Sequence, residues 1–284
     1  IMKLKLILFF LLAVFGYQEL KAQNLFFFQQ KLTDDFLFNP AYTGVSGGSF
    51  SATYRRVRTG ISDPPDVFYG SGHTVLPKNP IGFGGSVFTE RQELITNTRA
   101  SLSSSYQLPL TKDYSLSFGL GYEFFQSDLD RAEVFVRDQD DPLLDVDNRF
   151  QMDVSAGLVL THTLFDVGLS AGRMTSLFSE SDDSSLKGFY TVQGNGYIKT
   201  RYDYDMIEPR ILYQVNQSGE NILNASVFYT YNDMILLGAT YRTGSVGAMS
   251  VGLRWQNRYL ISYTGEHTFS AEGSDLGFGH EITL

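Results

Sequence analysis

The chain has 284 residues, a formal net charge of −9 at pH 7 and no cysteine. The acidic balance argues against a nucleic-acid-binding protein. The absence of cysteine excludes disulfides, thiol catalysis and cysteine-based metal sites. Aromatic residues make up 14% of the chain and accompany 27 glycines, a composition that favours strands and tight turns.

The first residues have the pattern of a secretory signal peptide. Lys3 and Lys5 precede a continuous apolar run at residues 6–15, and the small residue Ala22 follows. We therefore expect residues 1–22 to be a cleaved signal peptide. No later run approaches the roughly 18 apolar residues that a membrane-spanning helix needs.

In residues 23–46 the apolar residues follow no regular period, so we treat these residues as a separate segment. Pro40 keeps Asn39 out of the α region, and Gly44 interrupts the chain shortly afterwards. We expect an N-terminal arm or a plug in a lumen.

Strict alternation of apolar and small or polar residues then begins, and it is clearest at residues 114–124. Tyr114, Phe118 and Tyr122 belong to its apolar phase, with Ser117 and Gly119 in the opposite phase. A period of two predicts an extended strand with one apolar face. The segment is longer than an ordinary globular strand, and aromatic residues stand at both ends of its apolar face, as in strands that cross a lipid layer.

Similar segments recur to the end of the chain. They predict about 14 strands in an all-β fold, a transmembrane antiparallel up-and-down β-barrel covering residues 47–284. The predicted strands are residues 50–54, 66–75, 81–87, 100–108, 114–124, 150–160, 165–171, 188–199, 206–215, 223–231, 235–241, 249–255, 259–263 and 278–284.

The predicted connections alternate between short and mostly longer ones, as periplasmic turns and extracellular loops do in such barrels. The long set comprises residues 88–97, 126–149, 173–187 and 266–276. A soluble sandwich would give the same hydrophobic alternation, but it has no reason to alternate loop lengths.

The second of these long loops carries a dense acidic cluster, which we expect to be solvated and to contact a partner outside the cell. Calcium binding is the alternative, although the spacing lacks the glycine and terminal glutamate of an EF-hand. The acidic residues are Asp138, Asp140, Asp141, Asp145 and Asp147.

No catalytic, metal or cofactor site is predicted elsewhere. The four histidines share no ligand spacing, and serines on a strand face are far more often lumen lining than part of a lipid hydrolase site. Charged residues in the polar phase of the strands are expected to pair inside the barrel, with a selective channel as the alternative. These residues are Arg55, Arg99, Glu123, Asp153, Asp166, Arg210 and Arg254.

Short motifs spread along the chain resemble the PorP/SprF family of Bacteroidota. The more specific ones are Asn39, Pro40, Ala41 and Tyr42 near the start, and His280 with Glu281 near the end. Residues 167–170 and 237–242 add to the likeness.

The resemblance implies an outer-membrane barrel linked to type IX secretion and gliding motility. It implies that the protein is not an enzyme and helps to export or surface-anchor a secreted protein, such as an adhesin, that carries a type IX C-terminal signal domain. Periplasmic secretion-ring components and outer-membrane lipid are the other implied partners. The alternative, suggested by the barrel itself, is a channel for uptake or diffusion of small hydrophobic or polar solutes.

Overall fold

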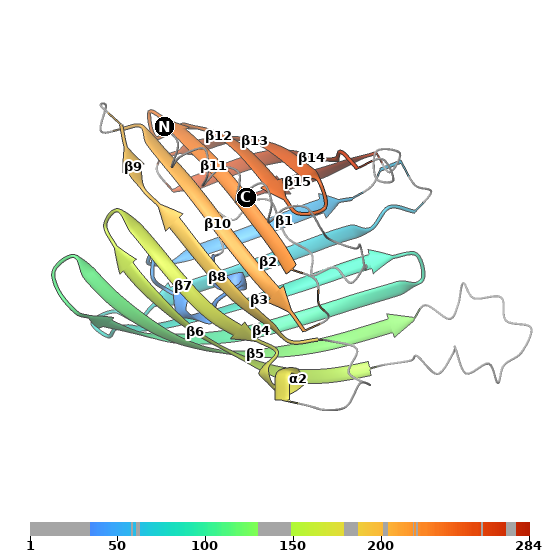
Figure 1. Cartoon of the computed structure of the whole chain (residues 1–284), viewed down its shortest axis with the longest axis horizontal. Helices are drawn as coiled ribbons and strands as arrows, with labels where there is room; N and C mark the ends of the chain where they lie inside the picture. Colours follow the sequence, from blue (N-terminus) through green and yellow to red (C-terminus); the bar gives the residue numbers. More distant parts are fainter. Residues whose placement is uncertain are drawn as a thin grey trace, which may run out of the picture.

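The alternating segments form β-strands in the computed structural model of the chain (Figure 1). The structure describes residues 35–57, 59–60, 63–129, 149–178, 187–200, 204–217, 219, 221–256, 258–270 and 277–284. Its short helices are η1 (Asp35–Leu37), η2 (Pro40–Tyr42) and α2 (Met174–Phe178). Its strands are β1 (Ser49–Arg56), β2 (Asp66–Val75), β3 (Ile81–Gln92), β4 (Ile95–Pro109), β5 (Tyr114–Leu129), β6 (Arg149–His162), β7 (Phe165–Gly172), β8 (Phe189–Gly196), β9 (Ile198–Lys199), β10 (Met206–Asn216), β11 (Asn221–Tyr231), β12 (Ile235–Arg242), β13 (Val246–Trp255), β14 (Tyr259–Thr268) and β15 (Phe278–Thr283).

The strands form one sheet that closes on itself. Each strand is antiparallel to its neighbours, and β1 closes the barrel by pairing with β15, where Tyr54 lies opposite Ile282. The two-residue β9 continues β8 along the same edge of β10, so the closed barrel has 14 strands. The predicted all-β transmembrane barrel is confirmed.

The two faces of β5 show how the alternation is used. Phe118, Leu120 and Tyr122 are 44%, 57% and 56% exposed on the outer face. Ser117 and Gly119 point the other way and are buried. The predicted sidedness of this strand is therefore confirmed, with the apolar phase outside and the small polar phase in the lumen.

The same division holds around the described barrel. Large apolar side chains such as Phe50 and Met249 are exposed on the outside, while serine, threonine and asparagine side chains are buried inside. This is the reverse of a soluble protein, in which apolar side chains fill the core. The outer surface suits a hydrocarbon environment.

The strand ends correct one predicted loop. Residues 88–97 were expected to be a long loop, but they continue β3 and β4 as far as a turn at Glu93, whose φ is 49°. Arg91 and Thr96 still pair across this hairpin. The hydrophobic pattern ends before the strand pairing does, because backbone ladders beyond the lipid layer need no apolar face.

The other predicted long loops are shorter than expected where they are described. β5 extends to Leu129, and residues 130–148 lie outside the described residues. α2 begins the 173–187 connection, and β14 continues to Thr268. Among the described residues, no helix is long and apolar enough to cross a membrane.

Charged side chains on the inner wall pair in part as the sequence predicts, since ion pairs form at Arg55, Glu123 and Arg210. Asp153 and Asp166 instead accept hydrogen bonds from Ser176 and Tyr42, and Arg99 lies over the ring of Phe88.

Arg55 Nη2 lies 2.8 Å from Glu266 Oε2, and Arg242 Nη2 lies 3.0 Å from Glu266 Oε1. Glu281 lies on the same side, 3.9 Å from Arg55 Nε. Since all these side chains are largely buried, the pairing offsets part of their desolvation.

Candidate functional site: a chain segment in the lumen

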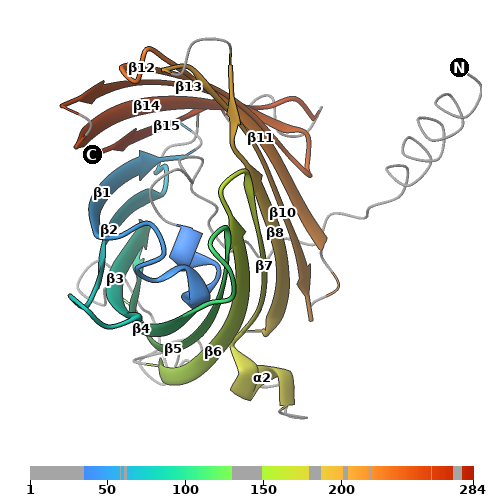
Figure 2. The same ribbon diagram turned by 90° about the vertical axis from the view of Figure 1, so that its left-hand side faces the viewer.

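Residues 35–46, called here the luminal segment, lie inside the barrel. Figure 2 shows η1 and η2 enclosed by the sheet, next to β4, β5, β6 and β7. Pro40 has a fixed φ and begins η2, while Asn39 precedes it with an extended backbone (φ −150°, ψ 110°). The turn formed by Asn39 and η2 is the part of the segment that contacts the wall.

Asn39 holds the turn to the barrel. Its Nδ2 atom donates to the carbonyl oxygens of Leu158 in β6 and Leu169 in β7, both at 3.2 Å. Its Oδ1 atom accepts from the backbone nitrogen of Ala41 at 2.9 Å and so caps η2. The side chain is fully buried, so losing these partners would leave buried polar atoms unsatisfied.

Serine hydroxyl groups on three strands bind the backbone of the luminal segment. Ser170 in β7 donates to the carbonyl oxygen of Phe38 at 2.7 Å. Ser117 in β5 donates to that of Ala41 at 2.6 Å. Ser105 in β4 donates to the carbonyl oxygen of Thr43 at 2.5 Å, and the hydroxyl of Thr43 donates to Ser103 Oγ at 2.8 Å.

Two wall glycines that face each other across β5 and β6 make room for the turn. Gly119 and Gly157 are paired residues in the ladder. A Cβ atom on Gly119 would lie 2.2 Å from the nitrogen of Ala41, and one on Gly157 would lie 1.9 Å from Asn39 Oδ1. Any larger residue at either position would displace the segment.

At the end of the turn, the phenol of Tyr42 contacts a buried carboxylate. Its hydroxyl donates to Asp166 Oδ1 in β7, which also accepts from Asn195 Nδ2 at 2.9 Å. Tyr197 donates to the other oxygen, Oδ2, at 2.5 Å. Burial raises the pKa of Tyr42, and the nearby Asp166 carboxylate raises it further, so the phenol stays protonated and remains a donor.

The two ends of the luminal segment are held by other groups. At the start, Asp35 Oδ2 lies 3.1 Å from Arg210 Nη1 in β10. Towards the end, the backbone nitrogen of Gly44 donates to His73 Nδ1 at 3.1 Å. The other ring nitrogen of His73 lies 2.8 Å from Ser49 Oγ in β1. The segment itself is therefore bound at one end to β2 and at the other to β10.

The structure separates the other predicted site residues from this cluster. Asn39, Pro40, Ala41 and Tyr42 lie together in the turn, with β15 supplying none of the contacts described above. In β15, His280 is exposed and its Nδ1 atom lies 2.6 Å from the hydroxyl of Tyr263, whereas Glu281 is buried near Arg55. The acidic residues Asp138, Asp140, Asp141, Asp145 and Asp147 lie outside the described residues.

Among the wall residues of the site, Asp166 and Arg210 were expected to pair inside the barrel, whereas no specific role was predicted for the serines and glycines. Serines next to glycines in the polar phase of adjacent strands are the signal that could have marked them. Within the ranges that the structure describes, no group of three or more histidine, cysteine, aspartate or glutamate side chains is placed to hold a metal ion.

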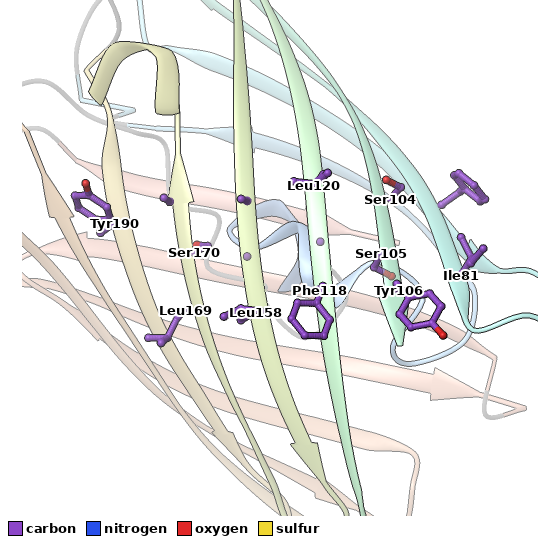
Figure 3. A pocket seen from close by; sticks show the side chains of 15 residues that line it. Ile81, Ser104, Ser105, Tyr106, Phe118, Leu120, Leu158, Leu169, Ser170 and Tyr190 are labelled. Carbon is purple, nitrogen blue, oxygen red and sulfur yellow. The ribbon is translucent and has the colours of Figure 1, made fainter. Parts of the chain in front are cut away.

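An apolar hollow lies behind the same wall, on its outer face. It has a volume of about 840 Å³ and is seen close up in Figure 3. Tyr106, Phe118, Leu158 and Leu169 line it from neighbouring strands, and all four side chains are substantially exposed. These outward side chains suit contact with lipid chains rather than with a polar ligand.

The model of a family described as the type IX secretion system membrane protein PorP/SprF matches residues 20–284. The chain belongs to this family. PorP/SprF membership and the barrel fold together show that the protein is located in the outer membrane. The comparison with curated proteins finds no significant sequence match.

Solved structures support the fold of this PorP/SprF protein. The toluene transporter TbuX from Ralstonia pickettii is similar at 9% identity and a TM-score of 0.52, over 87% of this chain and 90% of that chain. A deltaS2S3 mutant of TodX, described as a monoaromatic hydrocarbon channel, is similar at 11% identity and a TM-score of 0.51, over 87% of this chain and 92% of that one. At these identities the likeness shows the barrel architecture alone.

Proposed function

We propose that this protein is a non-enzymatic outer-membrane barrel that helps to export or surface-anchor a secreted protein, such as a gliding adhesin. The secreted protein would carry a type IX C-terminal signal domain, and periplasmic secretion-ring components would act with the barrel. The observation that carries the proposal is the family match over residues 20–284.

The interior of the barrel supports a role in binding rather than in free diffusion. The luminal segment fills part of the lumen and is bound to β4, β5, β6, β7 and β10 (Figure 2). Its described contacts include an ion pair and hydrogen bonds to buried groups on both the backbone and the side chains. A lumen occupied in this way favours partner contacts at the ends of the barrel.

The outer end is the proposed contact surface for the secreted protein. β5 and β6 are joined there by residues 130–148, which include the acidic cluster defined by Asp138 and Asp147. An acidic loop would favour a basic surface on the partner.

Deletion of the gene tests the proposal. We expect less of the large secreted protein encoded beside this gene to reach the cell surface. A plasmid copy of the wild-type gene should restore the amount. A second plasmid would carry asparagine at the five acidic positions and should restore less surface protein. Normal surface display in the deletion strain would contradict the proposal.

A solute channel is the second candidate, favoured by the non-covalent attachment of the luminal segment. The similar structures named above are described as a transporter and a channel, and a displaced segment would leave a path lined by buried serine and threonine side chains. Planar-bilayer conductance separates the two. An export or anchoring protein should be closed in the wild type, whereas a channel should conduct.

A further inference from the structure

We propose that the inner wall of β4, β5, β6 and β7 is a binding site for a polypeptide segment, and that the luminal segment is its resident occupant. A segment of a second protein with the same turn chemistry would replace it. The inference concerns the wall and does not depend on which secreted protein the barrel serves.

The wall recognises main-chain atoms. Ser105, Ser117 and Ser170 each donate to a backbone carbonyl oxygen of the luminal segment, at 2.5, 2.6 and 2.7 Å. Any polypeptide in the same conformation presents these acceptors. The contacts therefore describe a site for a chain segment as a class of ligand.

Other wall groups select side chains in that segment. The backbone carbonyls of Leu158 and Leu169 accept from an asparagine amide that precedes a proline turn. Asp166 accepts from a phenol three residues after that asparagine. Arg210 pairs at 3.1 Å with the carboxylate of Asp35, which lies four residues before the asparagine. The expected ligand is a turn with an asparagine, a following proline, a tyrosine and an upstream acidic residue.

The occupant can leave without opening the sheet. The barrel is closed by strand pairing alone, including β15 with β1, and the described luminal segment adds no strand to it. Its own backbone bonds are mostly local, such as Tyr42 nitrogen to Asn39 oxygen at 3.1 Å. Release would break non-covalent contacts to the wall and leave the ladder intact.

A labelled synthetic peptide with the sequence of residues 35–46 tests the site on the full-length protein in detergent. Asn39→Ala loosens the resident segment and leaves the wall unchanged. We expect this variant to bind the peptide saturably and at least tenfold more tightly than it binds a scrambled peptide. The wild type should bind the same peptide at least tenfold more weakly than the variant does. If Asn39→Ala does not fold, Tyr42→Phe is the alternative variant, because it also removes a contact that holds the resident segment.

A disulfide lock tests the competition directly. Thr43 Oγ1 and Ser103 Oγ lie 2.8 Å apart, and the chain has no native cysteine, so Thr43→Cys with Ser103→Cys gives one defined pair. Added to Asn39→Ala, the oxidised lock should abolish peptide binding and reduction should restore it.

Wall variants supply the matched control. In the Asn39→Ala protein, Ser117→Ala should weaken peptide binding at least fivefold, whereas Ser104→Ala, on the outer side of β4, should leave it unchanged. Equal binding to the oxidised and reduced lock would overturn the proposal, because the peptide would then bind elsewhere. Absence of saturable binding to the folded, loosened protein would overturn it as well.

Discussion

Asn39 and Leu158 are 119 positions apart in the chain, yet the Asn39 amide donates to the Leu158 carbonyl oxygen at 3.2 Å in the interior of the barrel. The same amide binds Leu169, so one side chain ties the luminal segment to two adjacent strands. The attachment of the segment is thus concentrated at a single turn.

Asn39→Ala should weaken the attachment of the luminal segment by about 1–3 kcal/mol, because buried donors and acceptors lose their partners. Hydrogen exchange measured on the segment amides should rise accordingly, while exchange in the strands stays slow. Ser46→Ala is the control, since Ser46 is exposed. Unchanged protection in Asn39→Ala would show that other contacts hold the turn.

Gly119→Ala should expel the turn from the wall while the barrel still assembles. The added methyl group would lie 2.2 Å from the backbone of Ala41, closer than any real Cβ contact. Limited proteolysis should cut the luminal segment faster, and bilayer conductance should increase. Gly70→Ala is the matched strand control, because nothing lies within 4 Å of its added atom.

Titration of Tyr42 should leave the attachment unchanged up to about pH 10 and weaken it above that pH. The pKa of Tyr42 is raised by burial, so the docked phenol holds its proton more tightly than a released one does. Above the pKa of the released phenol, ionisation stabilises the released segment, by about 1.4 kcal/mol per pH unit. Hydrogen exchange of Tyr42→Phe, compared with wild type at matched intrinsic rates, should lack this step. A step of equal size in both proteins would assign it to another group.

Leu120→Arg should destabilise the barrel by about 2–4 kcal/mol if its outer face contacts the bilayer midplane. Leu120 is 57% exposed in the middle of β5, and Leu110, 50% exposed in the turn before that strand, provides the control. Urea unfolding from lipid vesicles compares the two variants. Equal stability of Leu120→Arg and Leu110→Arg would contradict the assigned faces.

Glu266→Gln should cost about 3–5 kcal/mol, because it removes the charge that Arg55 and Arg242 share in the barrel interior. Asp66→Asn, which alters the partly exposed pair with Arg56, should cost much less. The same unfolding measurement checks both. Similar losses in the two variants would mean that the inner charges are well solvated.

The fold could be predicted from the sequence because apolar residues alternate with small or polar ones within each strand. In β5, the phase of Phe118 against that of Ser117 fixes which face meets lipid. The β3 and β4 hairpin was missed near Glu93, because polar strand pairs outside the lipid have no hydrophobic period. Local pattern thus identifies strands only where one face is apolar.

The luminal site could be predicted only in part. Pro40 and its neighbours were marked by the family resemblance, and a plug was one of two expectations for residues 23–46, whose boundaries stay a prediction. The partners of the turn could not be found, since Ser117, Leu158 and Asp166 are brought to one place by barrel closure and by no local signal. The role of the acidic loop that begins near Asp138 also stays a prediction.

The pairing of Gly119 with Gly157 also bears on the order in which the protein assembles. A slip of β5 against β6 by two residues would place either Ser117 or Gly121 opposite Gly157. In the first case a side chain would enter the position of the turn, and in the second the Ser117 hydroxyl would move away from the Ala41 carbonyl that it binds. The luminal segment leaves the ribosome first among the described residues, yet its seat is complete only after β10 has joined the sheet and brought Arg210 opposite Asp35. Its docking therefore reports that the strands have met in their correct register, and a chain with a misaligned wall would be left with its N-terminal segment exposed to proteases.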